Sequence, residues 1–149
     1  MDKSASSFQF KSYRVESIEF KVNEEFKPAE KVKLDFDIDA DVLVEDAAQQ
    51  SFRVVLTCVV FKNYRRANKP FRLKVSVSGE FRFKEKVPDA DLRKFSEINA
   101  VAVLFPYLRA VVTGVTAAAN QPPLILPLIN VYEFMRRKKG KAEGTAGGE

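Results

Sequence analysis

The sequence predicts an α+β fold in which a four-stranded antiparallel sheet is followed by a long helix, a proline-rich crossover and a short C-terminal helix. Apolar and polar residues alternate through the first half of the chain, which is the period of a half-buried strand. After Pro88 the apolar residues follow helical spacing. Residues 121–130 then combine three prolines with five Leu or Ile residues, a composition that suits neither a regular helix nor a central strand.

The first predicted strand, residues 8–22, is irregular. Its apolar residues near the start and the end share one phase, whereas Tyr13 and Val15 are out of phase. We therefore expect a bulge or bend between Ser12 and Ser17. A loop with Pro28 at its centre follows and joins this strand to the next.

Three further strands are predicted by their patterns. Residues 31–42 alternate strictly, with one apolar face and one face of Lys and Asp. Residues 52–61 are apolar on both faces, which is typical of a strand covered on both sides, and a partner is one candidate for the second cover. Residues 71–83 alternate again, and the turn residues of 63–70 predict a hairpin between these last two strands.

The helical part begins after Pro88 and contains a main helix over Leu104–Ala119 that ends at Asn120. Because proline is tolerated only in the first turn of a helix, Pro106 predicts a break near Val103–Phe105. The run Val101–Ala119 is apolar, but the charge of Arg109 near its centre favours a buried helix over a membrane span.

A last short helix is expected over 131–139. Residues 1–139 then form a single domain, and the Gly-rich residues 140–149 are expected to be a disordered tail. The N-terminal residues contain no apolar core of a signal peptide. We expect a cytoplasmic protein that does not insert into membranes.

Composition excludes much chemistry. Among 149 residues there is no histidine and one cysteine, Cys58, so a His-based triad, a His-liganded zinc site and an internal disulfide are all excluded. Cys58 lies in an apolar predicted strand and is expected to be an inert small hydrophobic residue. Carboxylates such as Glu19, Asp35 and Asp37 lie on predicted strand faces without a paired base. The sequence predicts no enzyme, no cofactor and no metal.

The charges are grouped rather than mixed. The net charge is +5 and the isoelectric point is about 9.3. Residues 35–46 contain six acids and no base, whereas residues 62–86 contain nine bases and two acids, and a third, basic block covers 136–141. Such blocks form a solvated strand face, or they attract nucleic acid, anionic lipid or acidic protein. The alternative function is therefore a basic nucleic-acid or membrane-surface binding module, although no stacking aromatics accompany the C-terminal block and no nucleic acid is expected.

One motif is more specific than these patterns. The segment Leu104–Arg109 (LFPYLR), followed by a proline-rich Leu/Ile crossover that ends at Asn130, resembles the SecB family of bacterial export chaperones. Segments 31–37, 53–56 and 74–81 resemble strands of that family in the same order, as do residues 8–10 with 18–20 for its first strand. The resemblance covers about residues 8–135.

The resemblance implies a homotetramer, a dimer of dimers, that binds unfolded or partly folded client proteins without ATP and delivers them to SecA. It implies a client-binding groove lined by the crossover, the second strand, the first connection and the last helix: Phe26, Val32, Leu34, Phe36, Leu124, Ile125, Leu126, Leu128, Ile129, Val131 and Phe134. It also implies an oligomer interface on the main helix: Leu104, Leu108, Val111, Val112 and Val115.

The chain departs from the family at two charged positions. Acidic residues through which the export chaperones contact SecA correspond to Lys21 and Lys74 here, which is a reversal of charge. Like charges opposed across an interface disfavour a partner. The reversal argues against the usual contact with SecA and favours a dedicated client such as an antitoxin, and both uses remain open.

Overall fold

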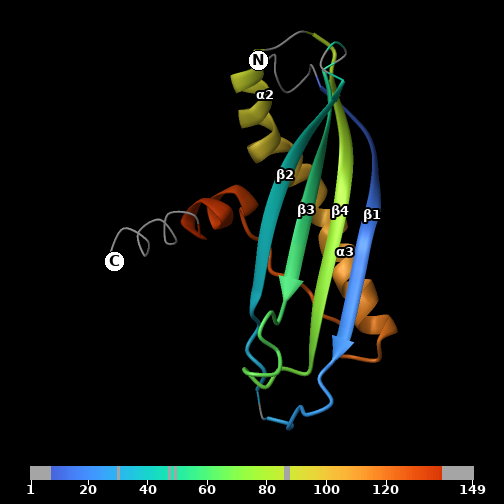
Figure 1. Ribbon diagram of the computed structural model, residues 1–149, viewed down its shortest axis with the longest axis vertical. Coiled ribbons are helices and arrows are strands. Elements are labelled where there is room, and N and C mark those ends of the chain that lie inside the picture. The colour runs from blue at the N-terminus through green and yellow to red at the C-terminus, as the bar shows by residue number, and fades with distance from the viewer. Residues whose placement is uncertain (1–7, 30, 47, 49, 86–87, 139–149) are drawn as a thin grey trace.

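The computed structural model describes residues 8–138 except 30, 47, 49 and 86–87. One antiparallel sheet has the strand order β1-β4-β3-β2, and the long helix α3 lies against one of its faces (Figure 1). The strands are β1 (Phe8–Val22), β2 (Phe36–Asp46), β3 (Ser51–Val60) and β4 (Phe71–Phe83). The predicted α+β arrangement is thus confirmed, while the predicted tail of 140–149 lies outside the described residues.

Strand β1 contains two bulges. Its register against β4 shifts between Phe10 and Ser12 and again between Val15 and Ser17. Between the two shifts Tyr13 pairs with Gly79 and Val15 with Val77, so both side chains lie on the face that also carries Phe10 and Ile18. The expected bulge is confirmed, and its effect is to place all the large apolar residues of β1 on the face that faces α3.

Strand β2 begins at Phe36, so the prediction of a strand from residue 31 was wrong at its start. Phe61 adopts a φ of 57°, which turns the chain away directly after β3. The Phe61 N–H still donates to the Asp35 carbonyl (2.9 Å), and beyond this bond residues 31–35 have no neighbouring strand to pair with. They continue alongside the sheet without regular structure.

The core lies between the inner faces of β3 and β4 and the helix α3 (Val101–Ala118). Leu104, Leu108 and Val112 of α3 are fully buried there, as are Phe52 and Phe81 of the sheet. The stretch Ile98–Ala118 is long and apolar enough to cross a membrane, but its buried side chains pack on the sheet, as a core helix requires. No helix of the described residues covers the other face of the sheet, which we call the open face.

The break before the main helix is not where Pro106 predicted it. Helix α2 (Asp89–Phe95) is followed by a π-helical turn, η1 (Ser96–Ala100), and α3 continues through Pro106. Proline leaves the carbonyl four residues earlier, that of Ala102, without its helical N–H partner. Ala102 and Pro106 are both exposed, so water can hydrate that carbonyl and the helix can continue.

Asparagines define the ends of the crossover. Asn120 has a φ of 60° and ends α3: its N–H donates to the Ala117 carbonyl (3.2 Å), and the Gln121 N–H donates to Thr116 (3.0 Å), as in a Schellman motif. The Asn130 side chain accepts from the Glu133 N–H (3.0 Å) and starts the C-terminal helix, residues 131–138. Both predicted helix boundaries are therefore confirmed to within a residue or two.

Helix α3 approaches the sheet closely at Gly79 of β4. A Cβ at this position would lie 2.6 Å from Cδ2 and 3.2 Å from Cγ of Leu104, and 2.9 Å from Cε2 of Phe81. Both neighbours are fully buried and cannot move aside freely.

We expect Gly79→Ala to lower the free energy of unfolding by about 1–3 kcal/mol in urea titrations followed by circular dichroism. Gly114→Ala on the exposed side of α3 is the matched control, since its Cβ meets nothing within 4 Å, and it should raise stability by about 0.5–1 kcal/mol. Equal effects of the two substitutions would contradict this account of the helix–sheet contact.

Candidate functional site

The crossover lies along α3 and is held there by polar side chains of the helix. Arg109 Nε donates to the Leu126 carbonyl (2.8 Å), and the Thr113 hydroxyl donates to the Leu124 carbonyl (2.7 Å). The Leu124 N–H in turn donates to the Thr116 hydroxyl (2.9 Å). A segment without regular structure must satisfy its peptide groups elsewhere. Here the helix provides the partners, so the crossover has a defined conformation despite its prolines.

Held in this way, the crossover places its apolar side chains alternately inward and outward. Leu126 is fully buried, and Leu124 and Ile129 pack against the core while remaining partly accessible. Ile125 is 67% exposed and Leu128 is 83% exposed. Two large aliphatic side chains are therefore exposed to solvent on a backbone that hydrogen bonds hold in place.

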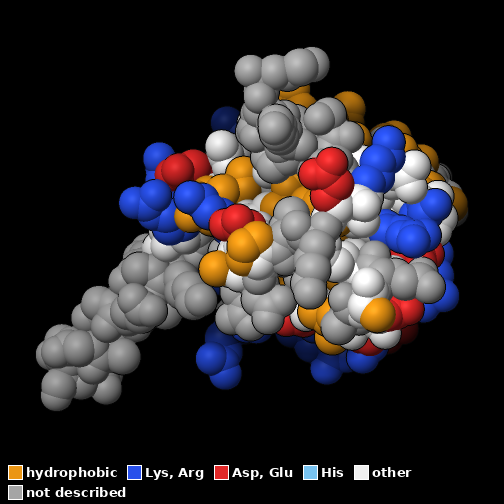
Figure 2. Space-filling view, turned by 90° about the horizontal axis from the view of Figure 1, so that it is seen from above, with side chains coloured by type: hydrophobic (Ala, Val, Ile, Leu, Met, Phe, Trp, Pro, Cys, Tyr) orange, Lys and Arg blue, Asp and Glu red, His pale blue; other side chains and the backbone are white. Residues whose placement is uncertain are grey.

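The C-terminal helix directly follows this segment in the chain and packs against the start of β2. The rings of Phe36 and Phe134 stack with their centroids 5.3 Å apart and an angle of 6° between their planes. Leu34 packs against the same core, and Val32 is 39% exposed. The partly or fully accessible side chains form what we call the apolar strip: Val32, Leu34, Phe36, Leu124, Ile125, Leu128, Ile129 and Phe134. Seen from above, apolar side chains reach the surface among basic and acidic ones (Figure 2).

Three residues predicted for the groove have other surroundings. Leu126 and Val131 are 0% and 4% exposed, so in this chain they anchor the crossover and the last helix in the core rather than face a client. Phe26 is half-buried in the loop between β1 and β2, where its N–H donates to the Asn23 carbonyl (3.1 Å). Burial of these side chains depends on packing in three dimensions, which the apolar character of the segments alone did not reveal.

The predicted oligomer residues also divide by burial. Leu104, Leu108 and Val112 are fully buried against the sheet of their own chain, so they have no surface left for a second subunit. Val111 and Val115 are half-buried at the border of this contact. Most of the residues predicted for the oligomer interface therefore cover the sheet of their own chain. Helical spacing identifies an apolar face of a helix without showing what that face contacts.

An accessible apolar surface that the sequence analysis missed lies on β1. Tyr13, Val15 and Ile18 point toward the helix side of the sheet, yet they are 42%, 41% and 49% exposed because α3 packs on β3 and β4. Tyr107 of α3 reaches across to this strand, with its ring 4.3 Å from that of Tyr13. The sequence did contain a sign of this surface: it predicted a single long helix, which is too narrow to cover all four strands.

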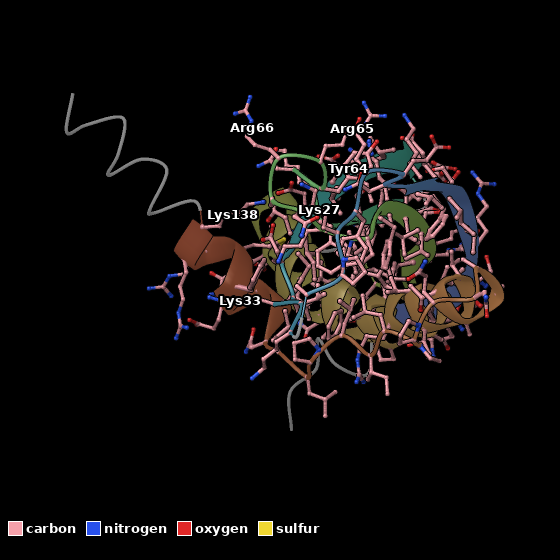
Figure 3. The ribbon with its side chains drawn as sticks, turned by 90° about the horizontal axis from the view of Figure 1, so that it is seen from below. Lys27, Lys33, Tyr64, Arg65, Arg66 and Lys138 are labelled. Atoms are coloured by element: carbon pink, nitrogen blue, oxygen red, sulfur yellow. The ribbon has the colours of Figure 1, made fainter. Side chains whose placement is uncertain are left out.

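Lys138 binds the C-terminal helix to the edge strand β2. Its Nζ donates to Asp37 Oδ1 (2.9 Å), to Asp39 Oδ1 (2.6 Å) and to the Ile38 carbonyl (3.3 Å), and Figure 3 shows Lys138 on that helix. The Ile38 N–H donates to Asp37 Oδ1 (3.0 Å). Both outward peptide groups of Ile38 thus have partners, which protects this part of the sheet edge from pairing with another chain.

The same contacts keep the Lys138 side chain protonated. Partial burial by itself lowers the pKa of this ammonium, but the hydrogen bonds to Asp39 and Asp37 outweigh it and the pKa is raised. A raised lysine pKa stabilises the fold fully below the ordinary value of about 10.4, and the contribution is lost only as the pH rises through the higher value in the folded state. The contact therefore persists across the physiological range.

The two reversed charges, Lys21 and Lys74, lie on the open face. Lys21 Nζ is 3.5 Å from Glu19 Oε1, and Arg72 NH1 donates to the same oxygen (3.1 Å). Lys74 is opposite Glu19 in the strand register and has no ion pair within 4.0 Å in the described part of the chain. The β1–β4 side of this face is therefore rich in bases, whereas the acids of β2 lie on its other side.

The one cysteine of the chain is buried and its thiol is protonated. Cys58 is fully buried on the inner face of β3, and burial, with a smaller effect of Asp37, raises the pKa of its thiol to about 12. Such a thiol stays protonated and is a poor nucleophile at neutral pH. Within the described ranges no group of three or more His, Cys, Asp or Glu side chains could hold a metal ion.

Comparison with known proteins identifies the family to which the chain belongs. The profile of the family described as preprotein translocase subunit SecB matches residues 3–142. The chain belongs to the SecB family. An uncharacterized protein of Methanocaldococcus jannaschii is 38% identical over 93% of this chain and 90% of its own length.

Two further relatives carry informative names. The protein-export protein SecB of Maricaulis maris is 30% identical over 75% of this chain, and the match spans 64% of that protein. In the solved structures, a Mycobacterium tuberculosis SecB-like chaperone, in complex with a ChAD peptide from the HigA1 antitoxin, superposes with a TM-score of 0.71. It covers 84% of this chain and 92% of its own at 20% identity, and it therefore confirms the fold.

Removal of the Lys138 ammonium tests its role at the sheet edge. We expect Lys138→Met to increase hydrogen exchange of the backbone amides in 131–138 by about twofold to fivefold, because partly exposed ion pairs stabilise by less than about 1 kcal/mol. Arg136→Met is the matched control, since Arg136 is 70% exposed and lies 4.0 Å from Glu133. Exchange that is unchanged in both variants would mean that the Phe36–Phe134 stack alone holds this helix.

Proposed function

We propose that this protein is an ATP-independent SecB-like holdase that binds unfolded or partly folded client polypeptides on the apolar strip. The observation that carries the proposal is the exposure of Ile125 and Leu128 on a backbone fixed by α3. Apolar surface contributes about 25 cal/mol per Å² when it is removed from water, whichever side chain provides it. A client segment therefore gains affinity from generic apolar residues, and no sequence motif is needed.

An exposed apolar surface must also avoid binding its own copies. Pro122, Pro123 and Pro127 have no N–H to donate, so the crossover is a poor template for strand pairing between chaperones. At the adjacent sheet edge, Lys138 and Asp37 occupy the outward peptide groups of Ile38. These features support a surface that stays available for clients and does not aggregate.

We further propose that the subunits form a homotetramer, a dimer of dimers, through the accessible apolar surface of β1 and Tyr107. This surface would become buried in the assembly, and it replaces the three core residues of α3 as the candidate contact. Several strips on one tetramer would bind one long client at once, which multiplies affinity through effective concentration.

We propose that the protein acts by binding alone, without enzyme activity and without a cofactor. We propose that it does so in the cytoplasm. The names of the relatives support two uses: protein export, as for the SecB proteins, and protection of a dedicated client such as an antitoxin. The bases Lys21, Lys74 and Arg72 on the open face favour the dedicated client, because a basic face disfavours the contact with SecA that acidic residues make in the family. Export through SecA remains the second use.

The strip predicts where a substitution should weaken protection. Ile125→Asp with Leu128→Asp should weaken suppression of aggregation of a chemically unfolded client by about tenfold, measured by light scattering without ATP. Both side chains are exposed, so the fold should be retained. Leu43→Asp with Val44→Asp, at side chains that are 53% and 56% exposed on β2, is the matched control and should protect like the wild type. Full protection by the crossover variant would exclude the strip as the client site.

The β1 surface predicts the state of assembly. Size-exclusion chromatography with light scattering should give about four times 16.9 kDa for the wild type. Ile18→Lys should shift the mass to a smaller species, because a lysine ammonium would be buried without a partner in the contact. Leu43→Lys, at a side chain of similar exposure, should leave the mass unchanged. A tetramer that persists in Ile18→Lys would place the subunit contact elsewhere.

A further inference from the structure

We propose that the apolar strip prefers client segments whose apolar residues are flanked by acidic residues. This inference rests on the proposed function and adds the class of client. It is carried by two groups of basic side chains that contacts within the chain hold near the strip. One group lies on the loops at the lower end of the sheet, and the other lies on the C-terminal helix.

The loops at the lower end, residues 23–35 and 61–70, are joined by two asparagines. The side chain of Asn23, which is 5% exposed, donates to the carbonyls of Lys69 (2.9 Å) and Tyr64 (3.3 Å). Asn68 accepts from the Lys27 N–H and donates to the Lys27 carbonyl, each at 2.9 Å. Because the two loops form one unit, the bases on them keep a fixed arrangement, and Figure 3 shows Lys27, Arg65 and Arg66 at this end.

The charge of this end is not balanced within it. The described residues of 23–35 hold three acids and three bases, whereas 61–70 holds four bases and no acid. Lys33, Arg65 and Arg66 are exposed and have no ion pair in the described part of the chain. A client carboxylate would therefore find cations there without having to displace an internal partner.

Lys69 places this charge beside the strip. Its Nζ donates to the Lys33 carbonyl (2.6 Å), which holds the basic loop against residues 31–35, the segment that carries Val32 and Leu34. Lys31 and Lys33 alternate with these two apolar residues and are exposed. A client chain lying on these apolar side chains would therefore lie close to cations of both segments.

The C-terminal helix supplies the second group. The Phe36–Phe134 stack holds the helix against the same end of the strip, and Arg136 and Arg137 are exposed on it. The nearby acids Asp37 and Asp39 are already engaged by Lys138. Bases from two segments thus lie near the strip, and a client with lysine or arginine beside its apolar residues would meet like charges.

The arrangement favours a peptide over nucleic acid as the occupant. In the basic loop the Phe61 ring is buried beneath Lys69, at 5.4 Å, and the half-buried Tyr64 ring lies beneath Arg65, also at 5.4 Å. The loop's aromatic rings are covered by its own cations, so they offer no open platform for stacking bases. The adjacent exposed surface is aliphatic, which suits Leu, Ile and Val side chains of an unfolded protein.

The test compares three fluorescein-labelled unstructured peptides with one Leu/Val core and with flanks of aspartate, serine or lysine. Fluorescence anisotropy at low salt should show the aspartate peptide binding about tenfold more tightly than the lysine peptide, with the serine peptide between them. The difference should shrink at about 1 M salt, where the Debye length is about 3 Å. Binding of the serine peptide should depend little on salt.

Charge-reversed variants locate the effect. Lys31→Glu, Lys33→Glu and Arg137→Glu together should invert the preference while binding the serine peptide normally. The matched control carries Lys11→Glu, Arg82→Glu and Lys84→Glu, the same change of charge on exposed residues at the opposite end of the sheet, and it should keep the wild-type order.

The outcomes separate this inference from the function on which it rests. Equal affinity for all three peptides, with binding intact, would overturn the charge preference and leave the holdase in place. Absence of binding to any peptide would overturn both. Tight, salt-sensitive binding of a structured RNA that is lost in the Lys31, Lys33 and Arg137 variant, without any preference among the peptides, would replace the inference with nucleic-acid docking.

Discussion

The architecture depends on one mismatch of size: a single helix must cover a sheet of four strands. Strands spaced at about 4.8 Å place the outer two about 14 Å apart, whereas a helix with its side chains is about 10 Å wide. Helix α3 therefore packs on β3 and β4 and leaves the helix-side faces of β1 and β2 incompletely covered. The chain covers the β2 side with the crossover and the last helix, and it leaves the β1 side accessible. The candidate client surface and the candidate subunit contact both arise because one helix cannot cover the whole sheet.

The crossover meets two requirements that ordinarily conflict. It must be apolar enough to bind clients, and it must have a fixed shape without being a strand, because a strand would invite pairing with other chains. Prolines remove the donors that pairing needs, and Thr113, Thr116 and Arg109 provide the partners that the remaining peptide groups need. Leu126 then anchors the segment in the core while Leu128 remains in water. Without the polar residues of α3 the same sequence would be a mobile apolar loop.

Much of the fold was predictable from local pattern. Strict alternation gave β4 at its observed bounds, and the phase change in β1 correctly predicted a bulge, because both depend on neighbours within one strand. The start of β2 was missed because it depends on where β3 ends, at a turn made by Phe61. The break near Pro106 was missed because its cost depends on whether the carbonyl of Ala102 can reach water. Pattern identified Leu104 and Leu126 as apolar, but only the packed chain shows that they are buried.

Selectivity without sequence readout follows from how the charges are held. An apolar strip alone accepts any apolar segment, and mobile surface lysines would add little because ordering each long side chain costs entropy. Here Asn23 and Asn68 join the backbone of the basic loop 61–70 to that of residues 23–35, and Lys69 fixes the basic loop to the part that carries Val32 and Leu34. The backbone positions of the cations are thereby set before a client arrives, and only their side-chain ends remain to be ordered. The same arrangement that admits acidic flanks opposes basic ones, so discrimination comes from the fixed sign of the surroundings and not from contacts with any particular side chain.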